Sequence, residues 1–259
     1  MKTKKILLAS ICIIFWNLKH ETCSCFAQGT RLWATYCGGA NVEWTNSVAT
    51  DASGNVYLAG QTDSPGGITS GGYDNTYNGG QDAFLVKCSP SGTRIWATYY
   101  GGPDDEEYLS VATDASGNVY LAGHTWSSAG IATAGSYQPA KAGSYDAFLV
   151  KFDGAGVRQW ATYYGGPTEE RGTAHVAANQ VTGDVYLAGQ TLSLTGIASG
   201  GIQNSYSNAG GGGWTNGFLV KFNSSGARQW ATYYGAGYEE SCSAAIDPSG
   251  NVYLAGITG

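Results

Sequence analysis

Short runs of apolar residues recur along this chain at a spacing of 63 to 70 residues. Three motifs carry the recurrence: Trp-Ala-Thr-Tyr at Trp33, Trp96, Trp160 and Trp230; Val-Tyr-Leu-Ala-Gly at Val56, Val119, Val185 and Val252; and Phe-Leu-Val-Lys at Phe84, Phe148 and Phe218. A repeat of this length is typical of propellers and solenoids, in which each copy of a supersecondary unit packs against the next.

One unit, residues 108–166, illustrates the predicted elements. Its apolar runs predict four strands, at residues 110–113, 118–124, 146–152 and 158–164. Short segments that contain Gly join the first two strands and the last two, as in hairpins. A long loop, residues 124–145, lies between the second and third strands. The runs are nearly continuous rather than alternating, which is expected of a sheet covered on both faces.

These patterns predict an all-β protein, a β-propeller with four-stranded antiparallel blades. A solenoid is the alternative, but its repeats are usually shorter and more uniform in length. Composition agrees, because 40 Gly and 13% aromatic residues disfavour helices. The 42% hydrophobic content is enough for a core, which argues against disorder.

The N-terminus predicts export. Lys2, Lys4 and Lys5 precede an apolar run at residues 6–16, as in a secretory signal, and the run is too short to span a membrane. We expect residues 1–27 to be a signal peptide that is cut after Ala27. A lipid anchor through Cys12 or Cys23 is the alternative. The predicted location is secreted or at the cell surface.

The remaining residues, 28–259, are predicted to form the propeller domain, with units at about 40–102, 103–166, 167–236 and a partial unit at 237–259. They contain nine basic and eighteen acidic residues, a net charge near −9. This charge disfavours nucleic acids and anionic membranes as partners.

Three cysteines lie beyond the leader: Cys37, Cys88 and Cys242. An odd number in unlike settings does not indicate a disulfide framework. Cys37 stands where sister units have Tyr100 and Tyr164, and Cys88 where they have Phe152 and Phe222. We therefore expect small buried side chains.

The repeated segments Asp-Ala-Phe-Leu-Val-Lys, Trp-Ala-Thr-Tyr-Tyr-Gly-Gly and Val-Ala-Thr-Asp-Ala-Ser-Gly-Asn-Val-Tyr-Leu-Ala-Gly resemble the seven-bladed β-propeller repeat (SBBP repeat) family. The resemblance implies a propeller, in secreted or cell-surface bacterial proteins that are often multidomain. It implies no particular activity.

The number of strands leaves ring closure open. We expect one strand at residues 31–37, three full units, and two strands ending at residue 257, which makes fifteen strands. Either the first strand completes the last blade, or the chain is a piece of a longer propeller. In the second case, further blades or a sorting domain would follow.

Strand order assigns the loops to two faces. The long loops share one face with the connections between units, and these connections are acidic. The candidate ligands for a hard cation such as Ca²⁺ are Glu43, Asp105, Glu106, Glu169, Glu170, Glu239 and Glu240, which would ring the mouth of a central channel. The alternative is that these acids cap backbone amides or are solvated. On the opposite face, Lys87, Lys151 and Lys221 are expected to be hairpin-end charges that aid solubility.

Three tryptophans fall outside the repeated motif: Trp44 in a connection between units, and Trp126 and Trp214 in long loops. Such aromatic rings in Gly-, Ser- and Asn-rich loops can stack on a sugar, or they can anchor their own loop. The predicted partner is a glycan or a protein bound on the long-loop face.

The sequence does not point to an enzyme. His124 and His175 do not recur in the sister units, and no nucleophile elbow or phosphate loop is present. The acids recur in unit after unit, which is unusual for a catalytic pair. A non-catalytic binding or adhesion module is the main hypothesis. A structural spacer within a larger surface protein is the alternative, and a propeller-type hydrolase or lyase ranks below both.

Overall fold

The computed structural model describes residues 32–207, 215–235 and 239–258. The chain divides into two compact units, residues 1–36 and 37–259, and the second contains every described strand. Three four-stranded antiparallel sheets, here called the first, second and third blades, are followed by a two-stranded sheet. No helix that could span a membrane occurs among the described residues.

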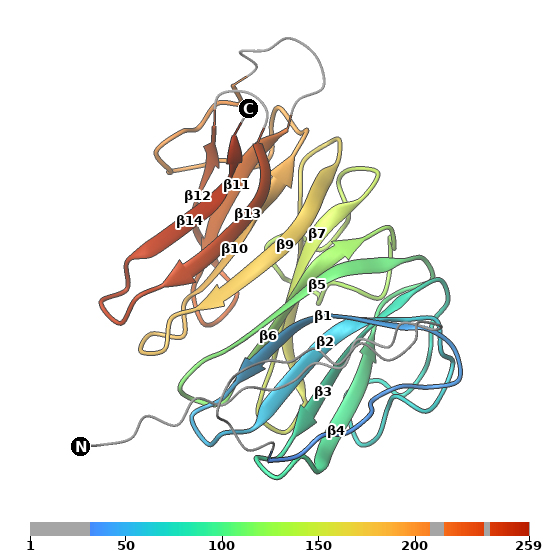
Figure 1. The fold of residues 1–259 in the computed structure, drawn as a ribbon. Helices are drawn as coiled ribbons and strands as arrows, with labels where there is room; N and C mark the ends of the chain where they lie inside the picture. The colour runs from blue at the N-terminus through green and yellow to red at the C-terminus, as the bar shows by residue number, and fades with distance from the viewer. Residues whose placement is uncertain (1–31, 208–214, 236–238, 259) are drawn as a thin grey trace, which may run out of the picture. The chain divides into compact units, whose positions relative to one another are not determined.

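Each sheet is built from strands that are consecutive in the chain (Figure 1). The first blade contains β1 (Glu43–Thr50), β2 (Val56–Thr62), β3 (Asp82–Cys88) and β4 (Arg94–Tyr100); the second contains β5 (Glu106–Thr113), β6 (Val119–Thr125), β7 (Asp146–Phe152) and β8 (Arg158–Tyr164); the third contains β9 (Glu170–Ala178), β10 (Val185–Thr191), β11 (Asn216–Phe222) and β12 (Arg228–Tyr234); and the last sheet contains β13 (Glu239–Ile246) and β14 (Val252–Thr258). The predicted all-β fold with four-stranded blades is confirmed.

Three of the described tight turns between first and second strands close on an aspartate, and the turn of the third blade closes on Asn179. In the second blade, Asp114 Oδ1 accepts hydrogen bonds from the backbone N–H groups of Ser116 and Asn118, at 2.9 and 3.0 Å. Gly117 has a φ of 79°, which a residue with a Cβ adopts only with strain. The same Asp and Gly chemistry recurs at Asp51 and Asp247, so the local sequence sets each hairpin.

Successive blades pack through their first strands. β1 contacts β5, β5 contacts β9, and β9 contacts β13, so the first strands lie side by side within the second unit (Figure 1). At each junction between two four-stranded blades, a tyrosine from the fourth strand packs into the next blade. The Tyr100 ring centroid lies 5.4 Å from that of Phe148 and 5.8 Å from that of Phe152. The Tyr100 hydroxyl donates to Ile131 O at 2.6 Å. Burial of these large rings holds the blades together.

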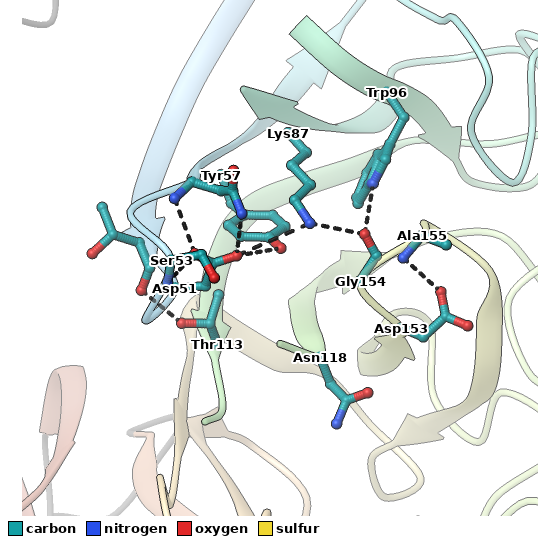
Figure 2. A network of polar contacts seen from close by, with 12 residues as sticks. Asp51, Ser53, Tyr57, Lys87, Trp96, Thr113, Asn118, Asp153, Gly154 and Ala155 are labelled. Carbon is teal, nitrogen blue, oxygen red and sulfur yellow. Dashed lines mark hydrogen bonds and ion pairs between the residues drawn. The ribbon is translucent and has the colours of Figure 1, made fainter. Parts of the chain in front are cut away.

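A polar clamp joins the first and second blades at the tight-turn end (Figure 2). Lys87 Nζ and Trp96 Nε1 both donate to Gly154 O in the β7–β8 turn, at 2.8 and 3.2 Å. Lys87 Nζ also lies 5.2 Å from the centroid of the Tyr57 ring. The expectation that Lys87 is a solvated hairpin-end charge is therefore wrong, because this side chain is buried within the junction.

The first expected strand differs from the structure. Residues 32–37 form no strand, so the expected strand at residues 31–37 is absent from the described part. The sequence left two alternatives for ring closure. The first of them, completion of the last blade by the first strand, is not observed, because the last sheet contains only β13 and β14 among the described residues.

Candidate ligand-binding face

The predicted acidic ring consists of side chains with separate partners. Glu106 and Glu170 begin β5 and β9 rather than lying in loops, and both are fully buried. Glu106 Oε1 accepts a hydrogen bond from Thr125 Oγ1 at 2.6 Å. Glu170 Oε1 accepts from Thr191 Oγ1 at 2.9 Å and from Ser193 Oγ at 2.8 Å. These carboxyl groups bind the end of their own hairpin instead of facing a channel.

A third-strand aspartate meets each buried glutamate across the junction. A Cβ on Gly101 would collide with both Glu106 Oε2 and Asp82 Oδ1, so both oxygens border the same point. Gly165 lies in the same way beside Glu170 and Asp146. Sequence reasoning missed the aspartates, although the Asp before each Ala-Phe-Leu-Val segment was a signal.

Burial sets the protonation of these pairs. It raises the pKa of Glu106 to about 8 and that of Asp82 to about 7, because both carboxyl groups lose the solvation of their charged forms. Repulsion by Asp82 raises the pKa of Glu106 further. Burial, followed by repulsion from Asp146, likewise raises the pKa of Glu170 to about 8.

The other predicted acidic ligands are also engaged singly. Glu43 accepts from Thr62 and Ser64, Asp105 accepts from the Gln81 backbone N–H, and Glu169 pairs with Arg171. The side chains of Glu239 and Glu240 lie outside the described residues. In the part of the chain that the structure describes, no three His, Cys, Asp or Glu side chains gather where one metal ion would touch them all. Calcium binding by this set stays a prediction, which thermal melts with calcium and with a chelator test.

The three predicted tryptophans have different outcomes. Trp44 lies within β1 rather than in a connection, and its side chain is 42% exposed. Trp126 stacks on Tyr145 of its own long loop, with ring centroids 4.5 Å apart and planes 17° apart. Lys141 Nζ donates to Trp126 O, so this tryptophan anchors the loop. Trp214 lies outside the described residues.

Sequence reasoning missed Tyr108, which lies near the start of β5 as Trp44 lies near the start of β1. Its backbone N–H donates to Gln61 Oε1 at 3.1 Å, and Gln61 is the ladder partner of Trp44. Tyr108 is 47% exposed and has a φ of 57°. Among the described residues it is the one non-glycine residue with a positive φ. The equivalent position of the third blade is Gly172, and this contrast was the available signal.

His124 connects Tyr108 with the long loop of the second blade. Its ring centroid lies 6.4 Å from that of Tyr108 and 5.8 Å from that of Tyr145. His124 is fully buried, and neither ring nitrogen has a hydrogen-bond partner in the described structure. Burial lowers the pKa of His124 to about 3, so the ring is neutral and acts as packing. We call Trp44, Tyr108, Tyr145 and Trp126 the aromatic rim.

An open cleft of about 580 Å³ continues the rim toward the third blade. Its lining includes Ser144, Thr168, Glu169, Arg171, Leu194 and Tyr206. Arg171 Nη2 lies 2.5 Å from Glu169 Oε2 and is half exposed. The backbone joins the cleft to the rim: the Glu170 N–H donates to Tyr145 O at 3.2 Å, and the Ser144 N–H donates to Thr168 O at 2.9 Å. The cleft thus presents donors, acceptors and apolar surface together.

This chain is similar to proteins found in two comparisons. The chain is 26% identical over 264 residues to an uncharacterised WD repeat-containing protein of Acanthamoeba polyphaga mimivirus; the match covers 87% of this chain and 18% of that protein. A crystal structure of a protein of unknown function from Dyadobacter fermentans is similar with a TM-score of 0.48 and 13% identity, over 84% of this chain and 63% of that one.

A family model described as a beta-propeller repeat, SBBP, matches residues 32–67 and 95–128. Each match joins a Trp-Ala-Thr-Tyr motif to the Val-Tyr-Leu-Ala-Gly motif that follows it, and the match at residues 95–128 crosses from the first blade into the second. These are the segments on which the sequence resemblance was based. Two segments of the chain thus match the β-propeller repeat of the SBBP family, which confirms the resemblance seen in the sequence.

Proposed function

We propose that this protein is an exported, non-catalytic binding module that recognises a glycan or protein partner through its long-loop face. The exposed pair Trp44 and Tyr108 carries this proposal. Both residues lie near the start of a first strand, and Gln61, the ladder partner of Trp44, accepts a hydrogen bond from the Tyr108 backbone N–H. Two exposed aromatic rings beside an amide suit a neutral, hydroxyl-rich ligand better than a charged one.

The backbone at Tyr108 supports the proposal. A left-handed conformation costs a residue with a Cβ roughly 1–2 kcal/mol, and the third blade avoids this cost with Gly172. Backbone strain of this kind persists chiefly at functional sites. Tyr108 is exposed rather than buried in the core, so we infer that its ring contacts a binding partner.

The cleft adds the polar contacts that a glycan requires. Arg171 donates, Glu169 accepts, and the pair can bridge neighbouring sugar hydroxyls. Leu194 and Tyr206 offer apolar surface to the carbon–hydrogen faces of a sugar ring. Because the backbone of Tyr145 bridges to Glu169 in the cleft lining, a chain of two or three sugars would extend from the cleft to the rim.

A glycan array tests the proposal. We expect the purified protein to bind a subset of neutral glycans, and Trp44→Ala or Tyr108→Ala to reduce binding at least tenfold. Tyr253→Ala is the matched control, because it removes a ring of similar exposure, 58%, from the tight-turn end of β14. Loss of binding in all three variants, or in none, would contradict the proposed site.

A protein partner and a pure spacer are the alternatives. Silence on the array, together with capture of one partner protein that Tyr108→Ala abolishes, would favour protein recognition on the same face. Silence in both experiments would favour a spacer. Export is tested separately: the secreted form should begin at Gln28, and N-terminal sequencing checks this.

A further inference from the structure

Each junction between two four-stranded blades contains an aromatic pair at the equivalent position. Tyr100, the last residue of β4, contacts Phe152, the last residue of β7, with ring centroids 5.8 Å apart. Tyr164, the last residue of β8, contacts Phe222 at the end of β11 in the same way, at 5.9 Å. The fourth-strand motif thus reaches the end of the third strand in the blade that follows.

At the first blade, both members of this pair are cysteines. Cys37 follows Trp33-Ala-Thr-Tyr36 as Tyr100 follows Trp96-Ala-Thr-Tyr99. Cys88 ends β3 and pairs with Arg94, as Phe152 ends β7 and pairs with Arg158. Two positions that touch in the other junctions have therefore changed together.

The surroundings of Cys88 confirm that the slot is the same. Arg94 Nη1 donates to Ile68 O at 2.9 Å, and Arg158 Nη1 donates to the equivalent Ile131 O at 3.5 Å. At the second blade the Tyr100 hydroxyl also donates to Ile131 O. Cys37 cannot supply that bond, so the first junction lacks both the ring contact and the hydroxyl bond of its sisters.

Cys37 and Cys88 are both free thiols in the structure, and the charge of Arg94 acts on each of them. Cys88 is buried and Cys37 is half-buried. Burial raises the pKa of Cys37 to about 11, and the neighbouring Cys88 raises it further. Both groups are therefore protonated at neutral pH, and their uncatalysed oxidation is slow because the thiolate is the reactive form.

We propose that Cys37 and Cys88 form a disulfide that fastens the segment around residue 37 to the first blade. Two S–H bonds break and one S–S bond forms. The two electrons and two protons pass to a disulfide oxidant such as oxidised glutathione, which leaves as two thiols. The bond replaces the aromatic contact of the other junctions with a covalent one. In the cell it draws on the export proposed above, whereas the test in vitro does not.

Peptide mapping after incubation with oxidised glutathione tests the bond. Trypsin cuts after Lys87 and separates the two cysteines into different peptides. We expect a nonreduced digest to contain residues 32–87 linked to residues 88–94, with a mass two hydrogens below their sum. Full alkylation of both thiols after oxidation, or a link from either one to Cys242, would overturn the proposal.

Stability supplies the second readout. We expect reductant to lower the melting temperature of the oxidised protein by several degrees and to leave Cys88→Ser unchanged. The matched variant Cys37→Tyr/Cys88→Phe restores the aromatic pair of the other junctions and should melt near the oxidised protein, with or without reductant. An equal response to reductant in Cys88→Ser and wild type would also overturn the proposal. If the disulfide proposal is correct and the proposed glycan site is wrong, the protein binds no glycan on the array, while the peptide map and the melting temperatures still show the disulfide.

Discussion

Tyr108 holds a left-handed backbone conformation (φ 57°) at the place where the third blade has Gly172 (φ 74°). The sequence shows a tyrosine in a variable connection and gives no indication of its φ. The bulge between Glu107 and Ser110 in β5 creates that conformation, and it depends on pairing with β6. A contrast between sister units was the one signal available.

Replacing Tyr108 with Gly should separate stability from binding. Tyr108→Gly relieves the left-handed strain and should raise the free energy of unfolding by about 1 kcal/mol. It also removes the exposed ring, so glycan binding should fall as in Tyr108→Ala. Gly172→Ala is the converse control and should lower stability. Denaturant unfolding measures both variants, and a less stable Tyr108→Gly would contradict the assignment of strain.

Glu170 gives a pH dependence with a definite sign. Its pKa is raised in the folded state, from 4.5 to about 8, so the folded protein holds a proton that the unfolded chain loses. Stability should therefore fall as pH rises from about 4.5 to about 8. Glu170→Gln mimics the protonated acid, because the side chain is neutral while Oε1 keeps its three donors.

We expect Glu170→Gln to melt close to wild type at pH 5 and several degrees higher at pH 8.5. Glu43→Gln is the control. Glu43 accepts the same kind of hydroxyl bonds, from Thr62 and Ser64, but it begins the first described blade, so no described blade precedes it. It should leave the pH slope unchanged. A wild-type slope in Glu170→Gln would show that Glu170 does not hold this proton.

The individual strands were largely predictable. The predicted strands at residues 146–152 and 158–164 coincide with β7 and β8, because both sides of these strands are apolar and Gly-bearing turns bound them. β5 begins at Glu106, four residues before the predicted start, because Glu106 pairs with Thr125 and their side chains bond. Polar residues bonded across a ladder carry no hydrophobic signal, so pattern reasoning read them as loop.

Interactions between blades were harder to predict than the strands. Lys87 reads as a surface charge, yet it bonds to Gly154 O of the next blade (Figure 2). Nothing local to either residue indicates that contact, because it depends on how two sheets stack. The same holds for Asp82 and Glu106, which meet only after the blades pack.

Two turn glycines separate backbone strain from crowding at a junction. Gly156 and Gly117 have similar φ values, 84° and 79°. A Cβ on Gly156 would lie 3.0 Å from the Trp96 ring, whereas a Cβ on Gly117 meets nothing within 4 Å. Gly117→Ala should cost about 1 kcal/mol from strain alone. Gly156→Ala should cost about 1–3 kcal/mol more, because the methyl group pushes against the clamp.

Chemical denaturation of Gly117→Ala and Gly156→Ala measures this difference directly. Equal losses would mean that Trp96 does not pack against the β7–β8 turn, and the clamp between the first and second blades would then be incorrect.

At the scale of the whole second unit, the order of the first strands creates the proposed binding face. Trp44, Tyr108 and Arg171 each lie within the first three residues of β1, β5 and β9. They come from positions more than 60 residues apart in sequence, and stacking of the first strands brings them to one end of the blades. Sequence reasoning identified this face from strand order and found Trp44, but not the other two residues.

The acidic residues illustrate the limit of reasoning from repeats. Recurring acids look like one ring when each unit is aligned with the next. In the described part of the chain, each of these acids has hydroxyl, amide or guanidinium partners of its own, and they do not converge on one point. Alignment of repeats locates a residue in its blade, whereas the partners of that residue depend on side chains from two blades.

Hydrogen–deuterium exchange, measured with and without a glycan identified on the array, tests the central claim most directly. If the glycan binds across the first-strand ends, backbone amides at residues 43–47, 106–110 and 168–172 should exchange more slowly in the complex. The tight turns at residues 51–55 and 114–118 should be unchanged. Protection confined to those turns, or spread evenly over all blades, would contradict a binding face built from Trp44, Tyr108 and Arg171.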